Sequence, residues 1–121
     1  MKLSRKSLIK KLDKVFSEYI RQRHAKGEIA ECVTCGKKDN WKNLQAGHFI
    51  SRKHYSTRWD RINVQVQCSG CNVFRYGEQY KFGVYLDKHY GVGTADELLN
   101  KSRKLTKLTN QDLLDLIEQY A

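Results

Sequence analysis

Hydrophobic residues in the first part of the chain recur at the period of an α-helix. From Leu8 to Ile20 they occupy positions i, i+1, i+4, i+7, i+8, i+11 and i+12, so they form one stripe along residues 4–25. The opposite face carries lysine and arginine, and Gly27 ends the pattern. The pattern predicts a helix whose stripe packs on the rest of the chain. A phosphate-binding role for the basic face and a dimer seam along the stripe are the alternatives.

The next part of the chain predicts short β-strands, and residues 62–67 alternate cleanly between apolar and polar residues with a period of two. The expected strands are residues 28–32, 41–45 and 62–67. A surface turn is expected at 37–40, and a polar loop rich in arginine at 50–61. The pattern predicts two or more short strands joined by polar connections.

Helical patterns return after the last strand. One helix is expected to begin directly after Cys71 and to run to about His89. Two more are expected over 94–100 and 109–120, each opened by a threonine that caps it and an acidic residue three positions later. Strands followed by helices predict an α+β fold.

All four cysteines fall in two pairs, Cys32-x-x-Cys35 and Cys68-x-x-Cys71, which are separated by 32 residues. Two such pairs are typical of a tetrahedral zinc site, and four sulfur ligands leave no open position, so this zinc is expected to be structural. Two disulfides are the alternative, but they need an oxidising compartment, and the first residues lack the apolar segment of a signal peptide.

The sequence therefore predicts a zinc-stapled protein that resides in the cytoplasm. No apolar run approaches the length of a membrane span, so no membrane contact is expected. We expect a single domain over residues 1–121, divided into a basic amphipathic helix (1–27), a zinc-stapled core (28–90) and C-terminal helices (91–121).

The net charge of +10 is concentrated in the first half of the chain. Residues 1–26 hold nine Lys and Arg against two acids, and residues 37–61 hold seven against two, whereas residues 62–121 balance at seven against seven. This asymmetry predicts a polyanionic partner, nucleic acid first. Solubility alone is the alternative.

Within this frame, the motifs are Cys-x-x-Cys, Gly-His at 47–48, an Asn at 63 and Cys-x-x-Cys-Asn at 68–72. This arrangement resembles the His-Asn-His endonuclease superfamily. The run 45–52, with Arg58, Asn63 and the run 67–72, is more narrowly similar to the NinG/Rap proteins of lambdoid phages. The similarity covers about residues 20–90.

The resemblance implies a treble-clef zinc module that carries a ββα-metal active site, flanked by the N-terminal helix and the C-terminal helices. It implies a DNA endonuclease that cuts branched recombination intermediates, such as Holliday junctions and flaps, alongside phage recombination proteins. If the chain is encoded by a phage, the expected cytoplasm is that of the bacterial host cell. A junction has two-fold symmetry, which suits a homodimer.

Carried across residue by residue, the resemblance implies that His48 is the general base that activates water. It implies that Asn63 pins the active-site loop, and that Asn72 binds the catalytic Mg²⁺ or Mn²⁺. A helix cap is the alternative for Asn72. Many relatives place an Asp before the base as a second metal ligand, but this chain has Gly47.

Two residues are candidates for the missing second ligand, Glu78 and His54. Four cations are candidates for holding the DNA backbone: Arg52, Lys53, Arg58 and Arg61. Three aromatic residues are candidates for stacking on unpaired bases, with the core as their alternative place: Trp41, Tyr55 and Trp59.

Two other functions stay open at this point. Gly47 also fits a zinc-stapled DNA-binding or adaptor module that does not cut DNA. A sequence-specific His-Asn-His nuclease is the third possibility, although the 121 residues offer no obvious extra recognition domain.

Overall fold

The computed structural model describes residues 3–121, in which helices surround two short antiparallel hairpins. The expected α+β class is confirmed. In chain order the elements are α1 (Arg5–Gln22), β1 (Ile29–Glu31), β2 (Lys38–Asn40), the 3₁₀ turn η1 (Trp41–Asn43), β3 (Gln45–His48), α2 (Tyr55–Arg58), β4 (Val64–Gln67), the π-helical turn η2 (Gly70–Phe74), α3 (Gln79–Tyr90), α4 (Thr94–Ser102) and α5 (Asn110–Tyr120).

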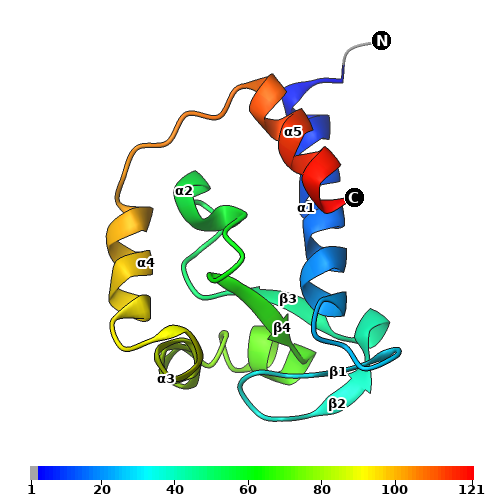
Figure 1. The fold of residues 1–121 in the computed structure, drawn as a ribbon, viewed down its shortest axis with the longest axis vertical. Coiled ribbons are helices and arrows are strands. Elements are labelled where there is room, and N and C mark those ends of the chain that lie inside the picture. The colour runs from blue at the N-terminus through cyan, green and yellow to red at the C-terminus, as the bar shows by residue number, and fades with distance from the viewer. Residues whose placement is uncertain (1–2) are drawn as a thin grey trace.

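Helix α1 buries its apolar stripe inside the chain. The side chains of Leu8, Leu12, Phe16 and Ile20 are nearly inaccessible to solvent and share one core cluster with residues of α5. Figure 1 shows the two helices side by side, although they lie at opposite ends of the sequence. The stripe is therefore not free to form a dimer seam, and that alternative is wrong.

The central hairpin pairs β3 with β4 and lies between α1 on one side and α3 with α4 on the other (Figure 1). Its register sets His48 opposite Val64 and Gln45 opposite Gln67. Val64 is fully buried against the α1–α5 cluster. The hairpin thus fixes both ends of β3 relative to the long helix.

Several expected boundaries in this region were wrong. Residues 41–43 form η1 rather than a strand, because the side chain of Asn40 accepts a hydrogen bond from the Lys42 N–H (3.0 Å) and caps the turn. Residues 38–40 are not a simple turn, since they pair with β1. The loop after β3 contains the short helix α2.

The chain does not continue as one helix after the last cysteine pair. It makes η2, then passes through Tyr76, Gly77 and Glu78, all with positive φ (54°, 87° and 50°), before α3 begins. The N–H of Gly77 donates to the carbonyl of Cys71 (2.8 Å), which closes a wide turn in place of an α-helical one.

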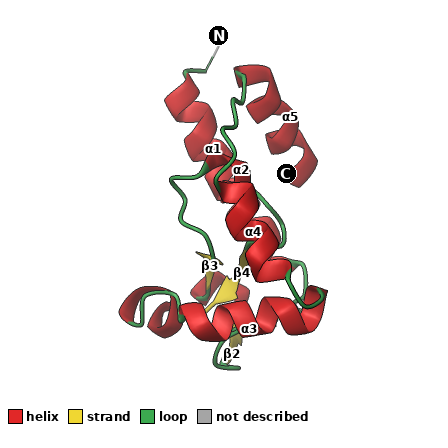
Figure 2. Ribbon diagram, turned by 90° about the vertical axis from the view of Figure 1, so that its left-hand side faces the viewer, coloured by secondary structure: helices red, strands yellow, loops and turns green. Residues whose placement is uncertain are grey.

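Helices α3 and α4 lie on the far side of the hairpin (Figure 2). Their residues Phe82, Leu86 and Leu98 form a core cluster separate from the α1–α5 cluster. Thr94 does not cap α4, since Gly93 occupies the cap position. The expected capping box of Thr109 and Asp112 at α5 is confirmed. No helix within residues 3–121 is long and apolar enough to cross a membrane.

Candidate functional site

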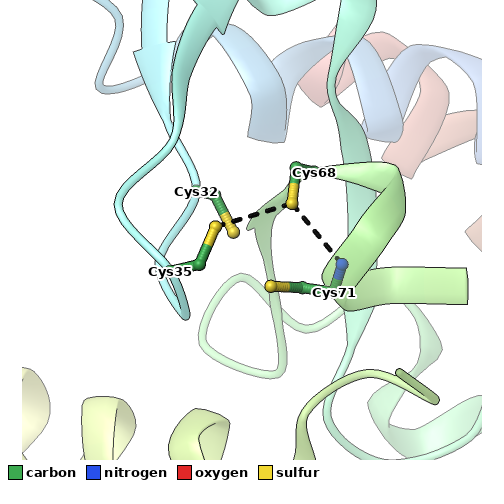
Figure 3. Close-up of side chains that lie close together, drawn as sticks. All are labelled: Cys32, Cys35, Cys68 and Cys71. Carbon is green, nitrogen blue, oxygen red and sulfur yellow. Dashed lines mark hydrogen bonds between the residues drawn. The ribbon is translucent and has the colours of Figure 1, made fainter. Parts of the chain in front are cut away.

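The four cysteines converge on one point, two from the loop between β1 and β2 and two from the segment after β4 (Figure 3). Their sulfur atoms all lie within 4.8 Å of one another, and the Sγ atoms of Cys35 and Cys68 are 3.6 Å apart. A tetrahedral zinc with Zn–S bonds of about 2.3 Å needs sulfurs about 3.8 Å apart. The expected four-cysteine cluster is confirmed, and its geometry can hold a zinc ion.

The surroundings of the sulfurs suit a bound cation. None of these four cysteines forms a disulfide, so the disulfide alternative does not apply. The backbone N–H of Lys37 lowers the pKa of Cys35, but burial and the three neighbouring sulfurs outweigh it and raise that pKa to about 12. Burial opposes ionisation of Cys32, yet hydrogen bonds, first from Thr34, lower its pKa to about 6. Four such thiols ionise together only with a cation between them.

His48 ends β3 and borders a cavity of about 270 Å³ beside α1. Its Nε2 lies 2.9 Å from the carbonyl oxygen of Arg58. Because a carbonyl only accepts hydrogen bonds, Nε2 carries the proton and Nδ1 keeps its lone pair. The cavity is lined by Asp13, Lys14, Phe16, Ser17, Ala46, His48 and Arg52.

The imidazole is held in its neutral form. Burial lowers the pKa of His48 to about 4, and the charges of Arg52 and Arg58 act in the same direction. The Arg58 carbonyl and the Asp13 carboxylate oppose this shift without cancelling it. At pH 7 the His48 side chain is therefore an unprotonated base.

Asn63 fixes the loop that holds His48. It is fully buried, and its Oδ1 accepts a hydrogen bond from the Ile50 N–H (2.8 Å). Its Nδ2 donates to the carbonyls of Ile50 (3.2 Å) and Thr57 (3.0 Å). The side chain thus ties both ends of the loop together, next to the Arg58 carbonyl that contacts His48.

Asp13 is a site residue that the sequence did not reveal. Its carboxylate accepts hydrogen bonds from Arg58 (2.5 and 3.1 Å), from the indole of Trp59 (2.9 Å) and from Arg52 (2.9 Å). Burial raises the pKa of Asp13, but these partners, Arg58 above all, hold it below its usual value. Only the tertiary contact of α1 with the loop brings these groups together.

Asn72 lies on the other side of the hairpin from the His48 cavity. Its Nδ2 donates to Oε1 of Gln45 (2.8 Å). Alternate residues of a strand point to opposite faces, so Gln45 and Gly47 face away from Ala46 and His48. The two predicted catalytic residues therefore approach β3 from opposite faces.

The space that an aspartate at position 47 would need is filled by another side chain. A Cβ atom on Gly47 would stand 1.8 Å from Oε1 of Gln67. Gln67 is fully buried, and its Nε2 is fixed by the Thr34 hydroxyl (3.1 Å) and the Gly77 carbonyl (2.9 Å). Its Oε1 is buried without any hydrogen-bond partner. Gln67 is the second residue that the sequence did not single out.

The two candidates for a second metal ligand lie elsewhere. Both oxygens of Glu78 are engaged, one with Arg75 (3.3 Å) and one with Lys81 (3.6 Å). His54 borders a different cavity, next to residues 102–106. Within residues 3–121, the cysteines are the only group of three or more His, Cys, Asp or Glu that is close enough to share an ion.

The four predicted DNA-binding cations do not line one cleft. Arg52 is 58% exposed at the His48 cavity, whereas Lys53 borders the cavity of His54. Arg61 is exposed near Tyr19. Arg58 is only 15% exposed and is bound to Asp13, so it stabilises the loop from inside. Lys14, which the sequence placed on the basic helix face, joins Arg52 at the cavity.

The predicted stacking aromatics are mostly packed. Trp59 is 7% exposed within the α1–α5 cluster, so the core alternative is right for it. Tyr55 stacks on Trp59 with ring centroids 5.7 Å apart. Trp41 is half-buried and is covered by the guanidinium of Arg21, 5.1 Å from the ring centroid.

A family model described as the bacteriophage lambda NinG protein matches residues 2–121. The chain belongs to the NinG family. NinG is a phage protein related to recombination, so the expected family is confirmed over nearly the whole chain rather than residues 20–90 alone. Comparison with curated proteins and with solved structures gave no match. The region that matches the NinG family model includes the zinc cluster, the His48 cavity and all described helices.

Proposed function

We propose that this NinG-family chain is a metal-dependent DNA endonuclease of the His-Asn-His type, with a treble-clef zinc module and a ββα-metal site, which acts on branched recombination intermediates. The observation that carries the proposal is the state of His48. It is neutral at pH 7, it is oriented by the Arg58 carbonyl, and it borders a cavity that also holds Lys14 and Arg52.

In this proposal, Nδ1 of His48 accepts the proton of a water that attacks the phosphorus in line. A base with its proton fixed on the other nitrogen needs no rearrangement before it accepts one. Lys14 and Arg52 bind the phosphate oxygens, while Asn63 and Arg58 keep the loop in place. Arg58 has a positioning role here rather than a direct contact with DNA.

The residues around Asn72 fit a hard divalent cation weakly. Asn72 donates its amide hydrogen to Gln45, which leaves its oxygen for a ligand, and Oε1 of Gln67 is a buried oxygen without a partner. Mg²⁺ or Mn²⁺ prefers such oxygens, and in a metal-dependent nuclease it would stabilise the charge on the departing 3′ oxygen. Both oxygens are neutral amides, and Asn72 approaches β3 from the face opposite to His48. An ion held by Asn72 alone would therefore not reach a phosphate held in the His48 cavity.

A zinc-stapled adaptor that binds branched DNA without cutting it is the second candidate. The observation in its favour is the steric exclusion of any acid at position 47 by Gln67. Nuclease and adaptor differ in one measurable property, strand scission.

The test is incubation of the zinc-loaded protein with a labelled four-way junction, a flap, a linear duplex and a single strand, each with Mg²⁺ or Mn²⁺. The proposal expects cuts with 5′-phosphate ends, and faster cutting of the branched substrates. Binding of all four DNAs with no scission in either ion would support the adaptor, and cuts at one linear sequence alone would support a sequence-specific nuclease.

A further inference from the structure

The segment that follows Asn72 exposes three aromatic side chains to solvent. Phe74, Tyr76 and Tyr80 are 77%, 88% and 84% exposed, and they are the three most exposed aromatic residues of the described chain. We propose that these residues, named here the aromatic surface, bind unpaired DNA bases by stacking. This inference rests on the proposed action on branched DNA and adds to it the residues that recognise the branch.

The backbone that presents this surface is strained. Tyr76 and Glu78 are the two non-glycine residues with positive φ within residues 3–121, and they flank Gly77. A left-handed conformation costs a residue with a Cβ atom about 1–2 kcal/mol. Such outliers persist where the surrounding structure imposes them, and they cluster at functional sites.

The zinc module imposes this conformation. The Gly77 N–H donates to the carbonyl of Cys71 (2.8 Å), and the Gly77 carbonyl accepts from the buried Gln67 side chain (2.9 Å). Arg75 contacts Sγ of Cys71 (3.2 Å) and pairs with Glu78 (3.3 Å). The turn is thus anchored to a metal ligand, and Tyr76 is held away from the core.

The chemistry of the segment favours bases over a protein partner. Its aromatics alternate with cations, because Arg75 lies between Phe74 and Tyr76 and Lys81 follows Tyr80. Arg75 and Lys81 both pair with Glu78, and they remain 51% and 62% exposed, so they place positive charge at the surface beside a stacked base. Aromatic faces spaced by cations are the usual platform for single-stranded nucleic acid.

The position of the aromatic surface in the chain and the geometry of branched DNA also favour unpaired bases as its ligand. Asn72, the predicted ligand of the catalytic metal, directly precedes this segment. In a linear duplex the faces of the bases are covered by their neighbours, whereas a branch or a single-stranded arm offers free faces. A stacking surface that begins directly after Asn72 would therefore select branched DNA over plain duplex.

The test compares the binding of a flap DNA with a single-stranded arm and of a blunt duplex, by fluorescence anisotropy in zinc-containing buffer without Mg²⁺ or Mn²⁺. Y76A/Y80A is expected to bind the flap about tenfold more weakly. Y76F/Y80F keeps the ring faces and is expected to bind like the wild type, whereas Y76L/Y80L keeps the apolar area and is expected to fail like the alanine variant.

Two controls accompany the test. L105A removes a 92% exposed side chain between α4 and α5 and is expected to change nothing. The salt dependence of flap binding is expected to keep its slope in the tyrosine variants, since no phosphate contact is removed.

Full binding by Y76L/Y80L, or an equal loss on flap and duplex, would overturn the inference. The inference would also be overturned if the wild type sedimented as a dimer, Y76A/Y80A as a monomer and Y76L/Y80L as a dimer, because the surface would then bind a second copy of the chain. The binding measurement does not depend on cleavage. If the protein binds the flap more tightly than the duplex but cuts neither, only the nuclease proposal is contradicted. If the protein cuts DNA and all variants bind the flap like the wild type, only this inference is contradicted.

Discussion

Gly47 is the residue whose replacement tests the hairpin geometry most sharply. In Gly47→Ala the new Cβ would lie 1.8 Å from Oε1 and 2.7 Å from Cδ of Gln67. The glutamine amide must then move, although it is fully buried and its Nε2 binds Thr34 and Gly77. The variant therefore loses packing and two hydrogen bonds at once.

Overpacking of a core costs about 1–3 kcal/mol, and each lost hydrogen bond about 1 kcal/mol. We expect Gly47→Ala to lower the free energy of unfolding by about 3 kcal/mol. The assay is urea unfolding of the zinc-loaded protein, followed by circular dichroism. Gly47→Asp places its Cβ at the same point, so it is expected to destabilise the protein as well and not to supply an acidic metal ligand.

A double-mutant cycle separates the collision from a general effect of the substitution. Gly47→Ala in a Gln67→Ala background is expected to cost less than about 1 kcal/mol, because the colliding atoms are gone. Gly83→Ala in α3 is the matched control. Its Cβ would meet Phe49 at 3.5 Å, an ordinary contact, so the variant is expected to be as stable as the wild type or up to about 1 kcal/mol more stable. Substitutions without a structural effect usually change the free energy of unfolding by less than about 0.5 kcal/mol. A change that small in Gly47→Ala would contradict the collision with Gln67.

Three further predictions concern the His48 site and the zinc. The folded protein lowers the pKa of His48 to about 4, so the unfolded chain binds the proton more readily as the pH falls from about 6.5 to about 4. Over that pH range the free energy of unfolding of the wild type should therefore fall by up to about 3 kcal/mol more than that of His48→Gln. Equal pH dependence of the two free energies would contradict the lowered pKa of His48. Asp13→Asn should lower the free energy of unfolding by about 2 kcal/mol, because the largely buried Arg58 loses its charged partner, whereas Asp96→Asn on the exposed surface of α4 should change it by less than about 0.5 kcal/mol. Removal of zinc with a chelator, or Cys68→Ser, should abolish cooperative unfolding, and a metal-free protein with an unchanged melting curve would refute a structural zinc.

The sequence predicted those parts of the fold that short-range patterns determine. The helical period located α1 and α5, and the capping box of Thr109 with Asp112 was confirmed because both partners lie within one turn. The spacing of the cysteines predicted their cluster, since two knuckles can close only around a shared point. The NinG family was recognised from motifs alone.

The parts that were missed depend on contacts between distant segments. The strand β2 exists because β1 pairs with it, not because its own residues favour a strand. Asp13 gains its role only when α1 packs beside the loop of Arg52 and Arg58. The collision between Gly47 and Gln67 depends on the register of β3 with β4, which a strand pattern leaves open.

The most direct test of the central claim is cleavage of a labelled four-way junction in Mg²⁺ by wild type and His48→Ala, with zinc content and junction binding measured on the same samples. The account predicts that the wild type cuts, and that the variant binds the junction and retains its zinc but does not cut. Cutting by His48→Ala at the wild-type rate would contradict His48 as the base, and a wild type that binds without cutting would contradict the endonuclease itself.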